Sequence, residues 1–471
     1  MLLAWVPLVA VAKKPVPPPP PLEQVAATLV GRALLSDEPY TELGTLCDDI
    51  GHRLSGSPEL NAAIAWGAAR MTEDGLVNVR QEPVMVPVWV RGETSAALTA
   101  PVARPLRVLA LGGTVGTPPG GVEAEVIVVG SFDELEARKA EVAGKIVLFD
   151  VPFTDYGETV AYRGGGPNAA ARLGAVAALV RSVSPTSLDT PHTGMTRTAD
   201  DVTPIPSAAV TIEAATQIRR MIDRGQPVKV RLTLGAHQLP DAPSANVVGE
   251  VRGRERPQEV VVLACHLDSW DVGQGAQDDG AGCAIAMGAA DLIRGLPVAP
   301  RRTVRVVLYT NEENGLAGGV AYAEAHPLTP SELHVAAIEA DTGAGRPLGF
   351  RMSLDEDETP ALVEPLIDAL APVADLLAPI GASALTVGHG GSDIGPLGSH
   401  GVPTLGLSQD TTGYWPIHHT EADTFDKIDP TVLAQNVAAM AVMAYALAEL
   451  PLPVGPAAGG TVSGAGGAPV R

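Results

Sequence analysis

The chain has 471 residues, enough for two or three domains that each bury a hydrophobic core. Hydrophobic residues make up 46% of it and charged residues 18%, a balance that excludes an intrinsically disordered protein. Its 32 basic and 54 acidic residues give a net charge of −22, which disfavours nucleic acids and anionic membrane surfaces as partners because both carry charge of the same sign.

The two ends of the chain differ in composition from the rest. Residues 1–12 are an apolar run ending in Ala-Val-Ala, which resembles a signal-peptide core although no basic segment precedes it. No other segment reaches the ~20 residues that span a bilayer, so we expect a soluble, exported protein, periplasmic or secreted. Residues 13–22 form a Pro-rich tether, and residues 453–471 a Gly/Ala-rich tail that we expect to be disordered.

Between the ends, the pattern of apolar residues changes twice. Over residues 23–95, helical periodicity predicts helices, one of them over 61–76, that lead into a short sheet. Residues 96–240 instead alternate turn signals with strand-like runs such as AEVIVVG and GKIVLFD. In this middle block, residues 168–183 predict a helix and residues 228–234 a last strand. The block holds no convergent set of metal-type ligands.

Residues 241–452 alternate strands and helices regularly. This order predicts an α/β fold with a mainly parallel, mixed sheet covered by helices on both faces. The continuous apolar runs typical of buried strands are residues 259–265, 303–309, 333–339 and 402–408. Residues 283–296 predict a helix, and a last helix begins with Asp429 as its N-cap and Pro430 at its first position.

Acidic and histidine residues gather where these four strands end. Ligands of open α/β sheets bind beyond the carboxyl ends of the strands, so these side chains should meet in one crevice. After the four strands come, in chain order, His266 with Asp268, Glu312 with Glu313, Asp341, and His418 with His419. A glycine-rich loop after the first strand adds Asp278 and Asp279.

Taken singly, each of these residues would more often be structural: a satisfied core histidine, a turn or N-cap aspartate, or a solvated glutamate. Several carboxylates in one crevice are costly, however, unless a cation neutralises them. Imidazoles and carboxylates without a thiolate suit a catalytic zinc site. Two histidines and three carboxylates suffice for two ions about 3.5–4 Å apart that share a bridging carboxylate, and one more carboxylate would serve as general base.

Four motifs then identify a family. HLDSWDVGQGAQDDGAG, YTNEENG, IEADTG and HHTEADT resemble the zinc aminopeptidase family of co-catalytic dizinc exopeptidases, in particular its carboxypeptidase Q (plasma glutamate carboxypeptidase) branch. HRLSGSPELNAAIAW, EPVMVPVWVRGE and PIPSAAVTIEAATQI extend the resemblance over residues 23 to 450. The resemblance implies a zinc-peptidase domain formed by residues 23–95 and 241–452, with residues 96–240 as an inserted β-rich protease-associated domain. It also implies a homodimer.

Matched by motif, the resemblance implies a role for each site residue. His266 and Asp341 would hold one zinc ion, Glu313 and His419 the other, and Asp278 would bridge the two. The glycines around Asp278 would let the loop turn so that its carboxylate reaches both ions.

Glu312 would be the general base that takes the proton of the attacking water and passes it to the leaving amine. Asp268 would orient His266 from behind, and Asp279 is a further candidate for a supporting or substrate contact.

The remaining candidates leave alternatives open. The family pattern favours His419 over His418 as ligand; His418 or Tyr414 would stabilise the oxyanion or only pack. In the segment GHGGSDIGPLG, His389 and Ser392 are candidates for substrate contacts, with a plain glycine-rich turn as the equal alternative.

The predicted activity is hydrolysis of dipeptides or short peptides, as a dipeptidase or a carboxypeptidase that removes a C-terminal residue. The alternative specificity is that of an aminopeptidase of the same family. Cyclisation of an N-terminal glutamine, which occurs on a related fold with one zinc ion, is disfavoured by the whole-chain resemblance. A binding protein that has lost catalysis is disfavoured because every ligand position is filled. Cys265 and Cys283 flank the first motif and could approach each other, with two separate buried thiols as the open alternative.

Overall fold

The computed structural model describes residues 18–197, 199–354 and 359–451. The expected signal-peptide core, the first part of the Pro-rich tether and the expected tail lie outside these residues.

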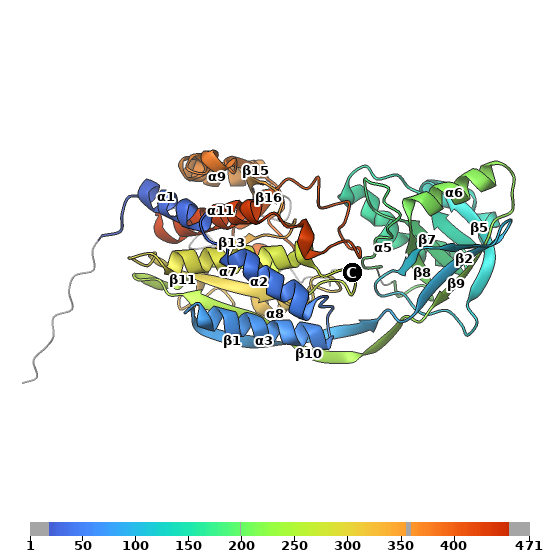
Figure 1. Cartoon of the computed structure of the whole chain (residues 1–471), viewed down its shortest axis with the longest axis horizontal. Helices are drawn as coiled ribbons and strands as arrows, with labels where there is room; N and C mark the ends of the chain where they lie inside the picture. Colours follow the sequence, from blue (N-terminus) through green and yellow to red (C-terminus); the bar gives the residue numbers. More distant parts are fainter. Residues whose placement is uncertain (1–17, 198, 355–358, 452–471) are drawn as a thin grey trace, which may run out of the picture.

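Two eight-stranded sheets lie side by side along the long axis of the described molecule (Figure 1). The first sheet has the strand order β1-β10-β12-β11-β13-β16-β14-β15. Its strands are β1 (Val77–Val90), β10 (His237–Val251), β11 (Arg256–His266), β12 (Arg302–Tyr309), β13 (Leu333–Glu339), β14 (Pro347–Ser353), β15 (Ala384–Val387) and β16 (Thr404–Gln409). The central strands β12, β11, β13 and β16 are parallel, as the sequence predicts.

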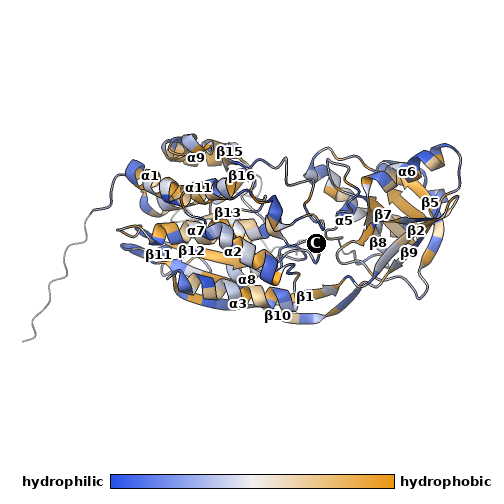
Figure 2. Ribbon diagram, in the orientation of Figure 1, coloured by the Kyte–Doolittle hydropathy of each residue, from blue (hydrophilic) through white to orange (hydrophobic). Residues whose placement is uncertain are grey.

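Helices cover both faces of this sheet. The larger core packs the strands against α1 (Leu22–Ala33), α2 (Glu38–Thr45), α3 (Pro58–Glu73), α7 (Ala281–Arg294), α9 (Pro360–Asp375) and α11 (Pro430–Glu449). The opposite face carries α8 (Ala317–Ala325) and α10 (Gly395–Ser399). Short helical turns occur at Leu46–Ile50, Lys139–Glu141, Ala276–Gly280, Ala378–Ile380 and Phe425–Lys427. Hydrophobic residues concentrate on the strands and on the helix faces turned toward them (Figure 2).

Helix α11 begins as predicted, because the Asp429 carboxylate accepts the backbone N–H groups of Thr431 and Val432. Contrary to the sequence expectation, this helix is long and apolar enough to cross a membrane. However, 83% of its apolar window is buried inside the protein, which is typical of a core helix of a soluble protein.

The second sheet is built by the middle of the chain. Its order is β3-β2-β9-β5-β6-β7-β8-β4. Its strands are β2 (Thr94–Ala100), β3 (Arg104–Leu106), β4 (Val108–Ala110), β5 (Val122–Val129), β6 (Ile146–Phe149), β7 (Ala177–Arg181), β8 (Ser207–Val210) and β9 (Lys229–Leu234), and its helices are α4 (Phe132–Ala137), α5 (Tyr156–Arg172) and α6 (Ile212–Asp223). The antiparallel pair β1 and β10 runs from the first sheet toward the second (Figure 1).

The helix predicted over residues 168–183 is wrong beyond Arg172. Helix α5 begins earlier, where Asp155 caps its first turn, and ends at Arg172. The apolar run that follows forms β7, which is buried between the parallel strands β6 and β8. Its alanines carry a helical pattern, but burial on both faces favours a strand.

Cys265 and Cys283 form a disulfide, so the alternative of two separate thiols does not hold. The bond joins the end of β11 to the first turn of α7. It therefore ties together the strand that ends in His266 and the helix that follows Asp278 and Asp279.

A polar network ties the strands of the first sheet together on the face covered by α8. His326 lies between two carboxylates, with Nδ1 2.8 Å from Glu332 and Nε2 3.0 Å from Glu82. Arg305 donates to the Tyr322 hydroxyl at 3.0 Å and to Glu332. Although burial opposes it, these two carboxylates raise the pKa of His326.

We expect His326→Gln to destabilise the protein by about 1–3 kcal/mol at pH ~6, through loss of charge-assisted hydrogen bonds. Because the folded-state pKa is raised, this stabilisation is complete below the unfolded value of about 6.5 and is lost as pH rises through the folded value. Urea unfolding of variant and wild type at pH ~6 and pH ~9 measures the effect. An equal difference at both pH values would contradict the assignment.

Candidate active site

The carboxyl ends of the four parallel strands bring the predicted ligands together. His266 is the last residue of β11, Glu313 follows β12, Asp341 follows β13 and His419 follows β16. Asp278 reaches the same place from the short turn Ala276–Gly280, which leads into α7. The turn begins at Gly275 with φ +59°, a conformation that glycine adopts readily.

Asp278 lies between the two imidazoles and turns one carboxylate oxygen toward each. His266 Nε2 is 3.3 Å from Asp278 Oδ1 and 3.3 Å from Asp341 Oδ1. His419 Nε2 is 3.2 Å from Asp278 Oδ2 and 3.1 Å from Glu313 Oε2. The five side chains thus form two groups that share Asp278.

This geometry fits two zinc ions. Zinc binds nitrogen and oxygen ligands at about 2.0–2.2 Å in tetrahedral sites, so adjacent ligand atoms lie roughly 3.3 Å apart. The imidazole–carboxylate distances of both groups, 3.1–3.3 Å, agree with that spacing.

Burial and charge shape the titration of the carboxylates. Burial raises the pKa of Glu313 to about 7 and that of Glu312 well above its usual value. Asp278 is also buried, but the nearby imidazoles of His266 and His419 hold its pKa well below the usual range.

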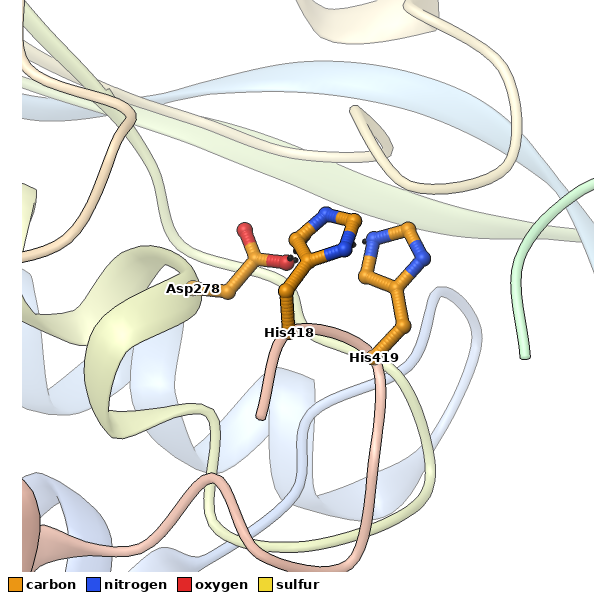
Figure 3. Close-up of side chains that lie close together, drawn as sticks. All are labelled: Asp278, His418 and His419. Carbon is orange, nitrogen blue, oxygen red and sulfur yellow. Dashed lines mark ion pairs between the residues drawn. The ribbon is translucent and has the colours of Figure 1, made fainter. Parts of the chain in front are cut away.

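Two neighbouring histidines compete for the second group. Figure 3 shows the rings of His418 and His419 side by side near Asp278, and they are stacked with their centroids 3.5 Å apart. His418 Nε2 is 3.4 Å from Asp278 Oδ2, but His419 contacts both Asp278 and Glu313. Edge contacts of His418 with Tyr156 and Trp415 indicate a packing role.

Asp268 organises the site differently from the expectation. The Nδ1 atom of His266 is 2.9 Å from the backbone carbonyl of Asp268, while the Asp268 carboxylate lies 3.9 Å from Nδ1. That carboxylate instead accepts the backbone N–H groups of Glu312 at 3.0 Å and Glu313 at 3.2 Å. Asp268 therefore orients one imidazole through its main chain and both glutamates through its side chain.

Asp279 is fully buried and supports the loop. Its carboxylate accepts the backbone N–H groups of Gly282 at 3.0 Å and His266 at 3.3 Å. The next predicted loop, which contains His389 and Ser392, is held by Glu339, whose carboxylate accepts the Ser392 N–H at 2.9 Å. His389 is exposed and Ser392 half-buried. Tyr414 is buried, with its ring 5.0 Å from that of His418.

The middle block contributes contacts that the sequence did not reveal. Thr193 donates its N–H to the His419 carbonyl at 3.0 Å, and its own carbonyl is 3.2 Å from His419 Nδ1. This carbonyl favours the tautomer that leaves Nε2 free for a metal. Arg163 Nη1 lies 3.4 Å from the same Nδ1. Gly194, which follows Thr193, leaves room for this guanidinium, since a Cβ there would lie 2.2 Å from Arg163 Cζ.

The chain is similar to known peptidases. The model of Peptidase family M28 matches residues 246–444. Carboxypeptidase Q from Xenopus laevis is 42% identical over 411 residues, covering 87% of this chain and 86% of the relative. Carboxypeptidase Q from Homo sapiens is 40% identical over 412 residues, covering 87% and 85%.

Solved structures show the same fold. A Peptidase M28 precursor from Shewanella amazonensis SB2B has a TM-score of 0.86 and 37% identity, covering 92% of this chain and 98% of that one. An aminopeptidase from Aneurinibacillus sp. strain AM-1, with a TM-score of 0.65 and 20% identity over 92% and 98% of the two chains, shares the fold.

Fold, site and relatives together define a metallopeptidase, a hydrolase of peptide bonds. The chain belongs to peptidase family M28 and, within it, to the carboxypeptidase Q branch. It is thus a zinc-dependent exopeptidase that acts on peptides.

Proposed function

We propose that the enzyme holds two zinc ions, one between His266 and Asp341 and one between Glu313 and His419, with Asp278 shared by both. The shared carboxylate carries this proposal, because its two oxygens face the two imidazoles at 3.3 and 3.2 Å. When bound, such a pair lowers the pKa of a water molecule and polarises the carbonyl under attack.

The residues of the chain supply the proton transfers. Glu312 neighbours the ligand Glu313, and Asp268 holds both backbone amides, so the two glutamates keep a fixed relation to each other. The half-buried Glu312 carboxylate takes the proton of the attacking water and delivers it to the leaving amine.

We further propose that the enzyme cleaves dipeptides or short peptides with a free C-terminal carboxylate, which Arg163 binds. The Arg163 side chain comes from α5 and is 7% exposed. Its hydrogen-bond partners are the Thr193 carbonyl, the Tyr156 hydroxyl and His419 Nδ1, none of which carries a negative charge. Among the described residues, no carboxylate forms an ion pair with it, and its buried Nε has no hydrogen-bond partner.

A buried cation without a counter-charge is costly, which argues for an anionic partner. The guanidinium fork matches a carboxylate, and the surrounding site is otherwise acidic. A peptide bound with its C-terminus at Arg163 would place its carboxylate beside His419, next to the proposed zinc pair.

Arg163→Met should lower kcat/KM on free dipeptides about 10- to 100-fold, as expected for loss of hydrogen bonds to a charged group. It should not lower further the slow cleavage of C-amidated dipeptides, which lack the carboxylate that Arg163 binds. Free, N-acetylated and C-amidated dipeptides, analysed by mass spectrometry, provide the measurement. The matched control is Arg172→Met on the same helix, whose exposed guanidinium pairs with Asp201.

Equal losses on free and amidated substrates would rule out carboxylate recognition by Arg163. In wild type, cleavage of amidated but not acetylated dipeptides would indicate an aminopeptidase, and cleavage of free dipeptides alone a strict dipeptidase. No cleavage of any form would favour a binding protein on a peptidase scaffold.

We also propose a domain organisation, a cellular location and an oligomeric state for the enzyme. Residues 96–240 would form an inserted protease-associated domain, supported by their separate sheet. Export is supported by the apolar start of the sequence and by the Cys265–Cys283 disulfide, since disulfides persist in oxidising compartments. A homodimer rests on the family resemblance.

A further inference from the structure

We propose that Arg53 is a positioning residue that fixes the loop between His266 and Asp278 in its metal-binding shape. The inference rests on the proposed function, because it concerns how Asp278 reaches the zinc pair. Arg53 lies in the segment between α2 and α3, far from this loop in the sequence.

The Arg53 side chain is fully buried and donates to four backbone carbonyl oxygens. The acceptors are Leu267 at 2.8 Å, Gly51 at 2.7 Å, Gln274 at 2.7 Å and Gly275 at 2.9 Å. Three of them belong to the loop, one directly after His266 and two shortly before Asp278.

The main chain of Arg53 strengthens the same attachment. Its N–H donates to Ser269 Oγ at 3.0 Å, and its carbonyl accepts the Ser269 N–H at 3.2 Å. Arg53 thus contacts the start, middle and end of a segment that has no helix or strand from Leu267 to Gly275.

The loop needs such an attachment. Fixing the backbone of one residue costs about 1–2 kcal/mol in conformational entropy, and two loop glycines, Gly273 and Gly275, have an unusually large conformational freedom to lose. Beyond the loop, Asp423 accepts the N–H groups of Gln277 at 2.7 Å and Asp278 at 3.2 Å. Arg53 therefore holds the approach to Asp278 and Asp423 holds Asp278 itself.

Arginine is suited to this place for two reasons. Its planar fork reaches several carbonyl oxygens at once, which a lysine ammonium on a flexible stem does not reproduce. Its charge also lies close to the acidic residues Asp268, Asp279 and Asp423, while its own side-chain hydrogen bonds go to backbone carbonyls.

The test compares Arg53→Lys with the wild type. We expect a folded protein whose zinc affinity, measured by chelator competition, falls about 10- to 100-fold, as is typical when groups supporting metal ligands are changed. At saturating zinc, kcat should fall while KM changes little. Amide hydrogen exchange of Ser269 and Gly280 should quicken in the zinc-free protein.

The matched control is Arg302→Lys. Arg302 is also buried and donates to two carbonyl oxygens, Leu447 and Leu450, at a distance from the site. This control should keep wild-type zinc affinity even if its Tm falls as far as that of Arg53→Lys. Unchanged affinity and exchange in Arg53→Lys, or an equal loss of zinc in Arg302→Lys, would overturn the proposal.

If Arg53→Lys does not fold, Ser269→Ala takes its place, since it removes only one contact of the attachment. A smaller loss of zinc affinity is then expected. An unchanged affinity would show that Arg53 supports folding but does not position the metal-binding loop. A wild type that binds no zinc would defeat the proposed function, while hydrogen exchange would still decide whether Arg53 fixes the loop.

Discussion

Glu312→Gln should retain the full zinc content and lose about 10²- to 10⁴-fold in kcat, the range that general acid–base catalysis contributes. Glutamine keeps the size of the side chain, and the Asp268 carboxylate still holds the backbone N–H at position 312, so the site should stay assembled. Only the proton acceptor is lost. Turnover of a dipeptide and zinc content by mass spectrometry are measured on the same sample.

The neighbouring glutamate is the matched control. Glu313 has its Oε2 atom 3.1 Å from His419 Nε2, so Glu313→Gln should lose zinc as well as activity. Loss of zinc in the Glu312 variant would mean that Glu312 is a metal ligand. Wild-type turnover in that variant would mean that Glu312 is not the general base. The pair of variants therefore separates the base from the ligand although they are adjacent in the sequence.

The central sheet could be predicted because its strands are continuous apolar runs, and such runs are typical of strands buried on both faces. Since the carboxyl ends of parallel strands meet at one edge, the residues after β11, β12, β13 and β16 were expected to converge. The structure links them by pairwise contacts of 3.1–3.4 Å centred on Asp278.

The part of the site that could not be predicted comes from packing between distant segments. Arg163 and Thr193 reach His419 only because the two sheets lie side by side, and neither residue type signals a metal site. Trp270 reinforces that contact, since a Cβ on Gly112 of the middle block would lie 2.0 Å from its ring. Local sequence patterns do not encode such contacts.

Two predictions from local sequence were corrected by the structure for the same reason. Asp268 was expected behind His266 through its carboxylate, but the main-chain carbonyl takes that place. In the middle block, the alanines of residues 168–183 suggested a helix, whereas burial between two parallel strands makes Ala177–Arg181 a strand. In both cases the tertiary environment decided between conformations that the local sequence permits equally.

Asp278→Ala is expected to abolish the paired zinc site, because this carboxylate is the group shared by both ligand sets. Zinc content should fall from about two ions per chain to one or none, and activity by at least the 10²- to 10⁴-fold expected for loss of the base, since the attacking water is no longer activated. Zinc should also raise the Tm of the wild type and not that of the variant, because a ligand stabilises only the state that binds it.

A second acidic cluster of the chain provides the control for this experiment. Glu38, Glu42 and Asp74 also gather in one place, but Arg70 donates to Glu42 at 2.9 Å and to Asp74 at 2.8 Å. Because that guanidinium already pairs with Glu42 and Asp74 and the cluster contains no histidine, Glu42→Gln should leave zinc content and turnover unchanged. Equal zinc loss in both variants would show that acidic surface, and not the bridge at Asp278, binds the metal; a fully loaded Asp278→Ala would exclude the bridging role.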